Sequence, residues 1–320
     1  MRILVTGGSG FIGTNLIQEL IERKHEVVNL DIKAPRLEAH VPLWREVSLL
    51  DENGTAQLLK EARPDYVFHA AARTDLRGRT RDEYAVNMTG TSNLVSAIKA
   101  AGCVRRTIFL SSMLVCRNGY RPTDDLDVCP NTTYGESKVE MERIVRARMG
   151  SARMEFVIVR PTSVWGPWFS EPYLQFFLAI RRGLYVHPGH VQVKKHFAYV
   201  GNVVRQLITL ITASSESCAG SVLYVGDYSE YIVREWADLV QRELGAHRIR
   251  TVPLPVLKVI ALAGDVLQSL GWRRVPLTSF RLSNMLTNNS LPFEKSARVF
   301  GALDYSVVDG VRKTVAWLDK

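Results

Sequence analysis

Hydrophobic and polar positions follow two different spacings along the first half of the chain. Short runs rich in β-branched residues predict five strands, at 2–6, 26–31, 66–70, 107–111 and 155–160. Longer stretches with apolar residues three and four apart predict helices between them, at about 12–23, 52–62, 82–101 and 132–149. Strands that alternate with helices predict βαβ units, and such units build a parallel sheet. We therefore expect an α/β protein.

The regular pattern ends after Pro161, where Trp165-Gly166-Pro167-Trp168 and later glycines and prolines interrupt it. Shorter mixed elements follow. We expect a boundary near residue 165 between a first domain, 1–165, and a smaller domain, 166–320, that closes over it. A helix expected near 202–213 and an apolar run at 222–225 leave open a return of segments near 196–226 to the first domain.

The longest later apolar stretch covers residues 254–270 and contains Lys258, Asp265 and Gln268. Three polar residues within that length argue against a helix that spans a bilayer. We favour an amphipathic helix that packs on the rest of its domain over one that lies on a membrane surface.

Composition narrows the class of protein. The chain has 320 residues, 46% hydrophobic and 23% charged, which excludes a disordered protein and a small disulfide scaffold. The four cysteines show no CxxC spacing, so we expect no metal site, no disulfide framework and a reducing compartment, the cytoplasm. Residues 1–5 run directly into a glycine turn and are too short for the apolar part of a signal peptide.

The net charge of +9 by itself allows nucleic acid, an anionic membrane surface or an anionic small molecule as a partner. The basic pairs are scattered along the chain, without a run of five and without interleaved aromatic residues. Such dispersed charge is typical of a solvated surface. We therefore expect no nucleic-acid partner and assign part of the charge to anionic small molecules.

The segment Thr6-Gly7-Gly8-Ser9-Gly10-Phe11-Ile12-Gly13 directly follows the first expected strand and opens the first expected helix. Gly7 permits a tight turn, Gly10 lets the backbone approach a diphosphate, and Gly13 lets helix and strand pack closely. The diphosphate would meet the helix N-terminus, where Phe11 and Ile12 lie. This order of strand, glycine turn and helix predicts a dinucleotide site.

Asp31 ends the second expected strand, eighteen positions beyond Gly13. A carboxylate there accepts from ribose hydroxyls and repels the 2'-phosphate of NADP, so NAD is the expected cofactor. Lys33 and Arg36 lie close in sequence and act against this preference. Asp51 has two interpretations, which are a contact with the adenine amino group and the N-cap of the next helix.

Tyr134 and Lys138 are four residues apart and therefore share one face of an expected helix. An ordinary tyrosine, with a pKa of about 10, is a poor base at neutral pH. We expect the lysine ammonium and the positive nicotinamide ring to stabilise the phenolate and bring Tyr134 into range for acid-base catalysis. Ser112 follows the fourth expected strand and is placed to hold a substrate hydroxyl or carbonyl in line with Tyr134.

Together these features resemble the extended short-chain dehydrogenase/reductase family, in its NAD-dependent epimerase/dehydratase group. The resemblance covers nearly the whole chain. It includes further motifs, which are His69-Ala70-Ala71-Ala72, Asn87 before Thr89-Gly90-Thr91, Arg160-Pro161, Gly166-Pro167 and Phe197-Ala198-Tyr199-Val200. The resemblance implies a Rossmann-type doubly wound parallel sheet with a smaller C-terminal α+β substrate domain. It also implies a homodimer through the helices near 82–101 and 132–149.

The resemblance adds residues to the expected site. In the family the alanine-rich strand end lies against the cofactor, and the residues after the Arg-Pro turn touch nicotinamide and substrate. It therefore implies cofactor contacts for Ala70, Ala71, Ala72, Asn87 and Pro161. Without the resemblance, Asn87 would be a residue at the start of a helix.

The reaction is narrowed by residues that follow Ser112. Dehydratases of this group carry an Asp-Glu pair there, whereas this chain has Met113 and Leu114, which argues against dehydration. Our first hypothesis is an NAD-dependent sugar-nucleotide 4-epimerase that transfers a hydride transiently to tightly bound NAD. The alternative is a net NAD(P)-dependent oxidoreductase, either a 4-ketosugar reductase or a 3β-hydroxysteroid-type dehydrogenase. Intact Ser112, Tyr134 and Lys138 argue against a binding protein without turnover.

The substrate residues depart from the family pattern. Family members that hold a nucleotide diphosphate usually have Asn after the Arg-Pro turn and Arg before the Phe/Tyr-x-Val segment, where this chain has Ser163 and Lys195. Lys195 is able to neutralise a phosphate but lacks the bidentate fork of arginine. We expect a nucleotide-diphosphate sugar at Ser163, Lys195 and Arg274, with Arg181, Arg182 and Arg273 as further candidates. The departures also resemble the sterol-dehydrogenase branch.

The aromatic segment from Trp165 to Phe177 is expected to form core beneath the cleft. Two of its members, Trp165 and Trp168, adjoin a Gly-Pro turn. They are candidates for the wall of a sugar pocket.

Overall fold

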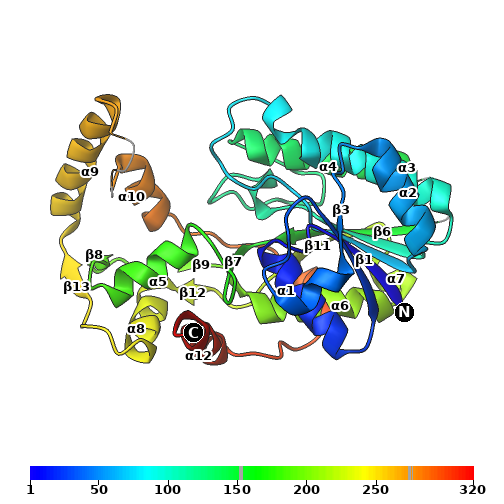
Figure 1. Ribbon diagram of the computed structural model, residues 1–320. Helices are drawn as coiled ribbons and strands as arrows, with labels where there is room; N and C mark the ends of the chain where they lie inside the picture. Colours follow the sequence, from blue (N-terminus) through cyan, green and yellow to red (C-terminus); the bar gives the residue numbers. More distant parts are fainter. Residues whose placement is uncertain (151–153, 273–274, 276) are drawn as a thin grey trace.

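A seven-stranded parallel sheet forms the centre of the molecule (Figure 1). The computed structural model describes residues 1–150, 154–272, 275 and 277–320. The strand order is β11-β6-β5-β4-β1-β2-β3. The strands are β1 (Arg2–Thr6), β2 (Glu26–Asp31), β3 (Trp44–Glu46), β4 (Tyr66–His69), β5 (Arg106–Leu110), β6 (Glu155–Pro161) and β11 (Val222–Val225). The expected strands and the parallel sheet are confirmed, and β3 and β11 extend the sheet at its two edges.

Helices cover both faces of the sheet because its strands are apolar on both sides. Ile3 and Val5 point to the face covered by α1 (Phe11–Glu22) and α6 (Val200–Thr212), whereas Leu4 points to the face covered by α2 (Glu52–Ala62) and α3 (Thr91–Ala101). Next to α3 lies α4 (Thr133–Met149), which packs on Phe109 and Ile158. The result is the Rossmann-type, doubly wound arrangement expected from the sequence.

The segment expected as one helix at 82–101 is divided in the structure. It consists of a 3-10 turn (Asp82–Tyr84), a π-helical turn (Val86–Gly90) and α3, which begins at Thr91. A π-helical turn holds one residue more than an α-helical turn, so side chains on either side of it change direction. That change puts Asn87 on the side that faces α4, where its amide bonds Ser137.

The remaining elements form short paired strands and small helices. β7 (Ser163–Trp165) pairs with β10 (Phe197–Tyr199), β8 (Val186–Pro188) with β13 (Arg250–Val252), and β9 (Lys194–Lys195) with β12 (Tyr231–Ile232). The helices are α5 (Tyr173–Arg181), α7 (Ser215–Cys218), α8 (Val233–Glu243), α9 (Leu254–Ser269), α10 (Ser279–Leu286), α11 (Glu294–Phe300) and α12 (Val307–Leu318). Trp165 is fully buried among Phe177, Tyr199 and Trp236. It is core, so the expectation of a sugar-pocket wall at Trp165 is wrong.

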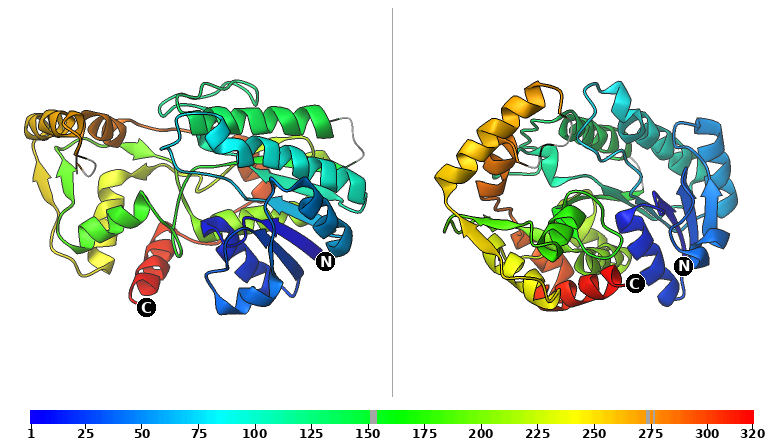
Figure 2. Two further views of the ribbon diagram at one scale, coloured as in Figure 1. Left: turned by 45° about the horizontal axis from the view of Figure 1, so that its top comes forward. Right: turned by 60° about the vertical axis from the view of Figure 1, so that its left-hand side comes forward.

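Helices α9 and α10 lie at the far end of the molecule from the sheet edge at β3 (Figures 1 and 2). Leu257 and Ala261 of α9 pack against Leu282 of α10. Gly264 permits this packing, because a Cβ there would stand 1.9 Å from the carbonyl oxygen of Leu277. The expectation of a helix that packs on its domain holds for this face alone, since the opposite apolar face of α9 is exposed.

Candidate functional site

The glycine turn connects β1 to α1 and lies against the end of β4. Gly7 has φ +73°, and a Cβ there would stand 2.5 Å from the backbone nitrogen of Ala71. A Cβ on Gly13 would stand 2.2 Å from the carbonyl oxygen of Gly7. Both glycines are therefore required by close backbone contacts, as the sequence predicts. Ala70, Ala71 and Ala72 follow β4 directly, and the backbone of Ala70 and Ala71 lies against Gly7.

The N-terminus of α1 has the properties of a diphosphate site. Gly10 is its N-cap, and among the described residues no side chain caps it. The backbone N–H groups of Phe11, Ile12 and Gly13 lie in the first turn, where they have no carbonyl partner within the helix. Backbone donors and the helix dipole together favour an anion at such a terminus. The turn therefore fits the diphosphate of NAD.

Asp31 lies beside this turn at the end of β2. One carboxylate oxygen accepts from the backbone nitrogen of Ser9, 3.0 Å away, and the other from that of Lys33, also 3.0 Å away. Each oxygen keeps a further lone pair for a ribose hydroxyl. Arg36 donates to the carbonyl oxygens of Ser9 and Trp168, which fixes its guanidinium at the same turn. Asp51 is the N-cap of α2 and accepts from Gly54, the second of its two expected roles.

His69 connects the glycine turn to α3 through two threonines. Its Nδ1 lies 2.8 Å from the hydroxyl of Thr6, and its Nε2 lies 2.8 Å from the hydroxyl of Thr91. The Thr91 hydroxyl donates its proton to the carbonyl oxygen of Asn87, so Nε2 of His69 carries a proton and Nδ1 accepts. Burial, and then the charge of Lys138, lower the pKa of His69 to about 3. The imidazole is thus a neutral structural bridge.

The expected catalytic residues meet where β5 and the first turn of α4 come together. Thr132 caps α4 by accepting from the backbone nitrogen of Gly135, 3.0 Å away, which starts the helix just before Tyr134. Tyr134 is buried and hydrogen-bonds Ser112. Lys138, only 2% exposed, donates through Nζ to the carbonyl oxygen of Leu110, 2.8 Å away. The structure therefore brings Ser112, Tyr134 and Lys138 together.

The pKa of Tyr134 departs from the sequence-based expectation. Burial raises it to about 12, and the hydrogen bond with Ser112 acts in the opposite direction. Burial also lowers the pKa of Lys138 to about 8, against the attraction of Glu142. Burial is thus the largest influence on the pKa of Tyr134, and the expected stabilisation of the phenolate by Lys138 together with the nicotinamide ring stays a prediction. Tyr134 holds its proton at neutral pH.

Asn87 supports the site by positioning backbone. Its side chain accepts from the backbone nitrogen of Arg73 at 2.9 Å and donates to the carbonyl oxygen of Arg73 at 3.0 Å. It also donates to Ser137, whose hydroxyl in turn donates to the carbonyl oxygen of Tyr134. Asn87 therefore ties the strand end after Ala72 to the turn that carries Tyr134. Arg73 further stacks its guanidinium over Tyr84, which packs on Tyr134.

A buried ion pair lies beneath the catalytic helix, and the sequence did not indicate it. Glu142 accepts from Arg160 at 2.9 Å on each of its two oxygens, and from Ser111 at 2.6 Å. Arg160 also donates to the carbonyl oxygen of Asp125. Both members of the pair are at most 1% exposed. Glu142 is four residues beyond Lys138, a helical spacing that could have identified it.

Most of the expected substrate residues that the structure describes have partners within the chain. Pro161, an expected cofactor contact, ends β6, and Ser163 hydrogen-bonds Tyr173. Lys195 donates to the carbonyl oxygen of Asn284 at 2.6 Å, so its ammonium holds α10, and burial lowers its pKa. Arg181 pairs with Asp319 at 2.8 Å, and Arg182 is exposed. Arg273 and Arg274 lie outside the described residues.

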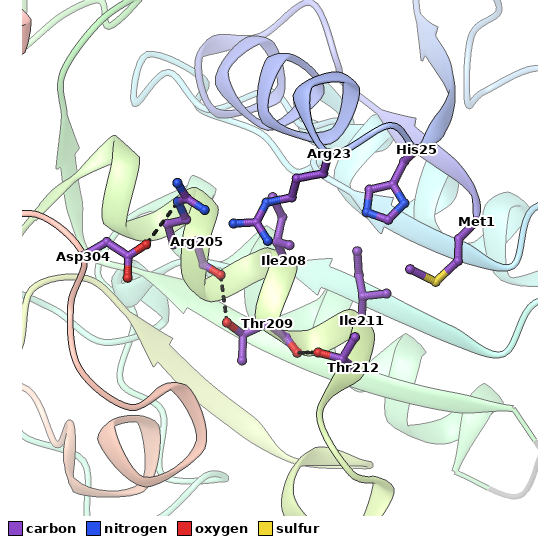
Figure 3. Close-up of a pocket in the computed structure, with 9 residues that line it drawn as sticks. All are labelled: Met1, Arg23, His25, Arg205, Ile208, Thr209, Ile211, Thr212 and Asp304. Atoms are coloured by element: carbon purple, nitrogen blue, oxygen red, sulfur yellow. Dashed lines mark hydrogen bonds and ion pairs between the residues drawn. The ribbon is translucent and has the colours of Figure 1, made fainter.

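A cavity of about 410 Å³ lies at the amino ends of the sheet strands β1 and β2 (Figure 3). Met1 and His25, which line it, directly precede β1 and β2. Parallel sheets bind dinucleotides at the opposite, carboxyl ends of their strands. Arg205, which also lines the cavity, is paired with Asp304 and Glu19. The cavity is therefore separate from the catalytic residues.

Comparison with known proteins places these features in a family. The model of the NAD-dependent epimerase/dehydratase family matches residues 3–226. A 3-beta-hydroxysteroid dehydrogenase of Mycolicibacterium neoaurum is 34% identical over 65% of this chain and 60% of its own length. A UDP-glucose 4-epimerase of Vibrio cholerae is 30% identical over 70% of each chain. A 2-alkyl-3-oxoalkanoate reductase of Stenotrophomonas maltophilia is 26% identical over 99% of each chain.

Known structures share the fold. The UDP-glucose 4-epimerase of Thermotoga maritima superposes with a TM-score of 0.77 at 22% identity, covering 100% of this chain and 99% of its own. At this level of identity the match concerns the arrangement of the backbone. The matched region spans about six-tenths of the length of the steroid dehydrogenase relatives.

Proposed function

The chain belongs to the NAD-dependent epimerase/dehydratase family, and from this premise we propose that it is a net oxidoreductase that interconverts a ketone and a secondary alcohol on a largely apolar substrate. NAD is the cofactor of the family. The observation that carries the proposal is the position of Lys195. The family pattern puts a cation for a sugar diphosphate at this position, but here the ammonium is partly buried and donates to the carbonyl oxygen of Asn284, so part of its hydrogen-bonding capacity is used within the chain.

The surroundings of Ser112 support an apolar substrate. Met113, the next residue, packs with Tyr224, Leu291 and Phe293 in one buried cluster. The structure next to Ser112 is therefore apolar and has few groups that could hydrogen-bond a sugar. One relative that matches this chain over 99% of both lengths is a reductase of 2-alkyl-3-oxoalkanoates, which carry alkyl groups.

The catalytic residues hold and transfer the proton that the ketone oxygen receives. When bound, NAD supplies the hydride acceptor of the alcohol and, once reduced, the hydride donor to the ketone. Tyr134 holds its proton at neutral pH and is therefore ready to protonate a ketone oxygen. Ser112, hydrogen-bonded to Tyr134, orients the same oxygen. Lys138 holds its positive charge below pH 8 and, fixed by Leu110, favours negative charge that develops on the tyrosine oxygen.

A sugar-nucleotide 4-epimerase is the second candidate. The 30% identity to the Vibrio cholerae UDP-glucose 4-epimerase over 70% of each chain favours it. Both candidates need the same proton and hydride transfers. They differ in net redox change, since an epimerase returns its hydride to the substrate.

The test measures net NADH. Purified protein with NAD is incubated separately with 3β-hydroxysteroids and 2-alkyl-3-hydroxyalkanoates, and with NADH and the matching ketones. UDP- and GDP-hexoses form a third panel. The proposal expects NADH to appear or disappear in proportion to substrate consumed with at least one apolar compound. Conversion of a UDP-hexose without net NADH, and no turnover of any apolar compound, would select the epimerase instead.

Tyr134→Phe checks the assignment of the proton donor. The variant keeps the ring but lacks the hydroxyl, and we expect kcat to fall about a thousandfold with NAD binding retained. Tyr185→Phe, which removes a hydroxyl outside the site, is the matched control and should keep its activity. An unchanged rate in Tyr134→Phe would mean that another group carries the proton.

A further inference from the structure

The outer surface of α9 carries a continuous apolar face. Its members recur at helical spacing and are between 36% and 72% exposed, namely Val256, Val259, Ile260, Val266, Leu267 and Leu270. Their spacing of three, four and seven residues puts them on one side of the helix. The opposite side, with Leu257 and Ala261, packs on α10. Contiguous exposed apolar patches of this kind mark interaction sites.

The apolar surface continues around the end of α9. Trp272 is 63% exposed and Phe280 of α10 is 69% exposed. Together with Gln268, Val275, Thr278 and Arg281 they line a cavity of about 360 Å³. Large aromatic side chains next to an apolar helix face are typical of residues that settle at the boundary between lipid and water.

The charge of this part of the chain complements an anionic surface. Among the residues of 247–293 that the structure describes, four are Lys or Arg and one, Asp265, is acidic, so they carry a net charge of +3. All four cations are exposed, namely Arg248, Arg250, Lys258 and Arg281. Asp265 accepts from the backbone nitrogen of Ser279, which orients it toward α10. An exposed apolar helix face within a basic segment is the pattern of helices that lie in the plane of an anionic bilayer.

We propose that α9 and the start of α10 dock on an anionic membrane surface, with Val259 and its neighbours in the acyl boundary and the basic residues at the lipid phosphates. The mode of docking is in the plane of the membrane, since no helix within the described ranges is long and apolar enough to cross one. A second copy of the chain is a poorer occupant. In a two-fold dimer each patch would meet its own image, and the two positive segments would repel.

The experiment measures binding of the full chain to vesicles, without NAD or substrate, so it is independent of the proposed function. Vesicles of phosphatidylcholine alone are compared with vesicles of phosphatidylcholine and phosphatidylglycerol by sedimentation. We expect binding to the anionic vesicles and weaker binding at high salt. Val259→Glu with Val266→Glu should weaken binding at least about tenfold, because two valines that dock in the acyl boundary become charged. Val41→Glu, an equally drastic change at an exposed valine far from α9, is the matched control.

Two further measurements keep the result decisive. Trp272→Phe should remove a lipid-dependent shift in tryptophan fluorescence, which does not require the charged variant to fold. Gel filtration shows the oligomeric state of the wild type and of the doubly charged variant. A wild-type chain that ignores anionic vesicles overturns the proposal, and so does a dimer that the α9 substitutions convert to monomer without any vesicle binding. Equal binding by the wild type and the doubly charged variant would also overturn it.

Discussion

Helices α4 and α9 have similar lengths, 17 and 16 residues, but α4 buries charged side chains whereas α9 exposes apolar ones. On α4, the charged Lys138 and Glu142 are at most 2% exposed. On α9, the apolar Val259 and Val266 are 67% and 58% exposed. The difference shows where each helix makes its essential contacts. The buried charges of α4 have their partners inside the chain, whereas the apolar side chains on the outer face of α9 are exposed to solvent.

Burial of charge on α4 is possible because each charged group has a partner. The Lys138 ammonium has the carbonyl oxygen of Leu110, and Glu142 has Arg160 and Ser111. An unpaired buried charge would lose its hydration without compensation. The buried charged groups of α4 and their partners therefore depend on one another for stability. Each side chain on the outer face of α9, in contrast, can be substituted without leaving a buried partner unpaired.

The largest expected effect on stability comes from breaking the buried pair. Glu142→Gln removes the charge opposite Arg160 and should lower the free energy of unfolding by about 3–5 kcal/mol. Glu140→Gln is the matched control on the same helix, because its pair with Arg143 is exposed. That control should stay within about 1 kcal/mol of wild type by urea unfolding. Similar losses in the two variants would contradict the special role of the buried pair.

A smaller effect is expected from the pH dependence of His69. Its pKa is about 3 in the folded protein, compared with 6.5 when unperturbed. Between these values the unfolded state binds one proton more than the native state, so stability rises with pH and is lost as pH falls. This group should cost up to about 2 kcal/mol between pH 6.5 and about pH 5.

Urea unfolding at both pH values checks this contribution. His69→Gln should lose the His69 part of the pH dependence, while His190→Gln, at an exposed histidine, should keep it. A pH dependence in His69→Gln as steep as in the wild type would show that His69, the neutral bridge between Thr6 and Thr91, contributes nothing to the pH dependence of stability.

The smallest effect should come from the exposed face of α9. Val259→Ala should change the free energy of unfolding by less than about 0.5 kcal/mol, as expected of a solvent-facing substitution. Leu257→Ala, two residues earlier on the packed face, should cost about 2–4 kcal/mol. Thermal and urea unfolding measure the stability of both variants. A large loss in Val259→Ala would mean that the outer face packs against the protein after all.

The sequence predicted those parts of the molecule in which a local pattern determines the structure. Short runs of β-branched residues identified the five strands. The spacing of Gly7, Gly10 and Gly13 identified the turn, since each of these glycines makes a close contact with nearby backbone. Tyr134 and Lys138 were found because four residues make one helical turn. All of these depend on neighbours within a few positions along the chain.

Features that depend on distant partners were not predicted. Lys195 was expected at a phosphate, but its partner is the carbonyl oxygen of Asn284, 89 positions away. The direction of the pKa shift of Tyr134 depends on how completely the fold removes water. The pattern of α9 contains two apolar faces, and only the position of α10 decides that Leu257 is covered and Val259 is exposed.

The contact between Gly264 and the carbonyl oxygen of Leu277 constrains how this protein can diverge. At 1.9 Å from that oxygen a Cβ cannot be accommodated, so any mutation at position 264 separates α9 from the segment before α10. We expect descendants of this chain to keep glycine there whatever lipid they meet. Positions 256, 259 and 260 would instead exchange freely among apolar residues and drift to polar ones in any lineage that abandons the membrane.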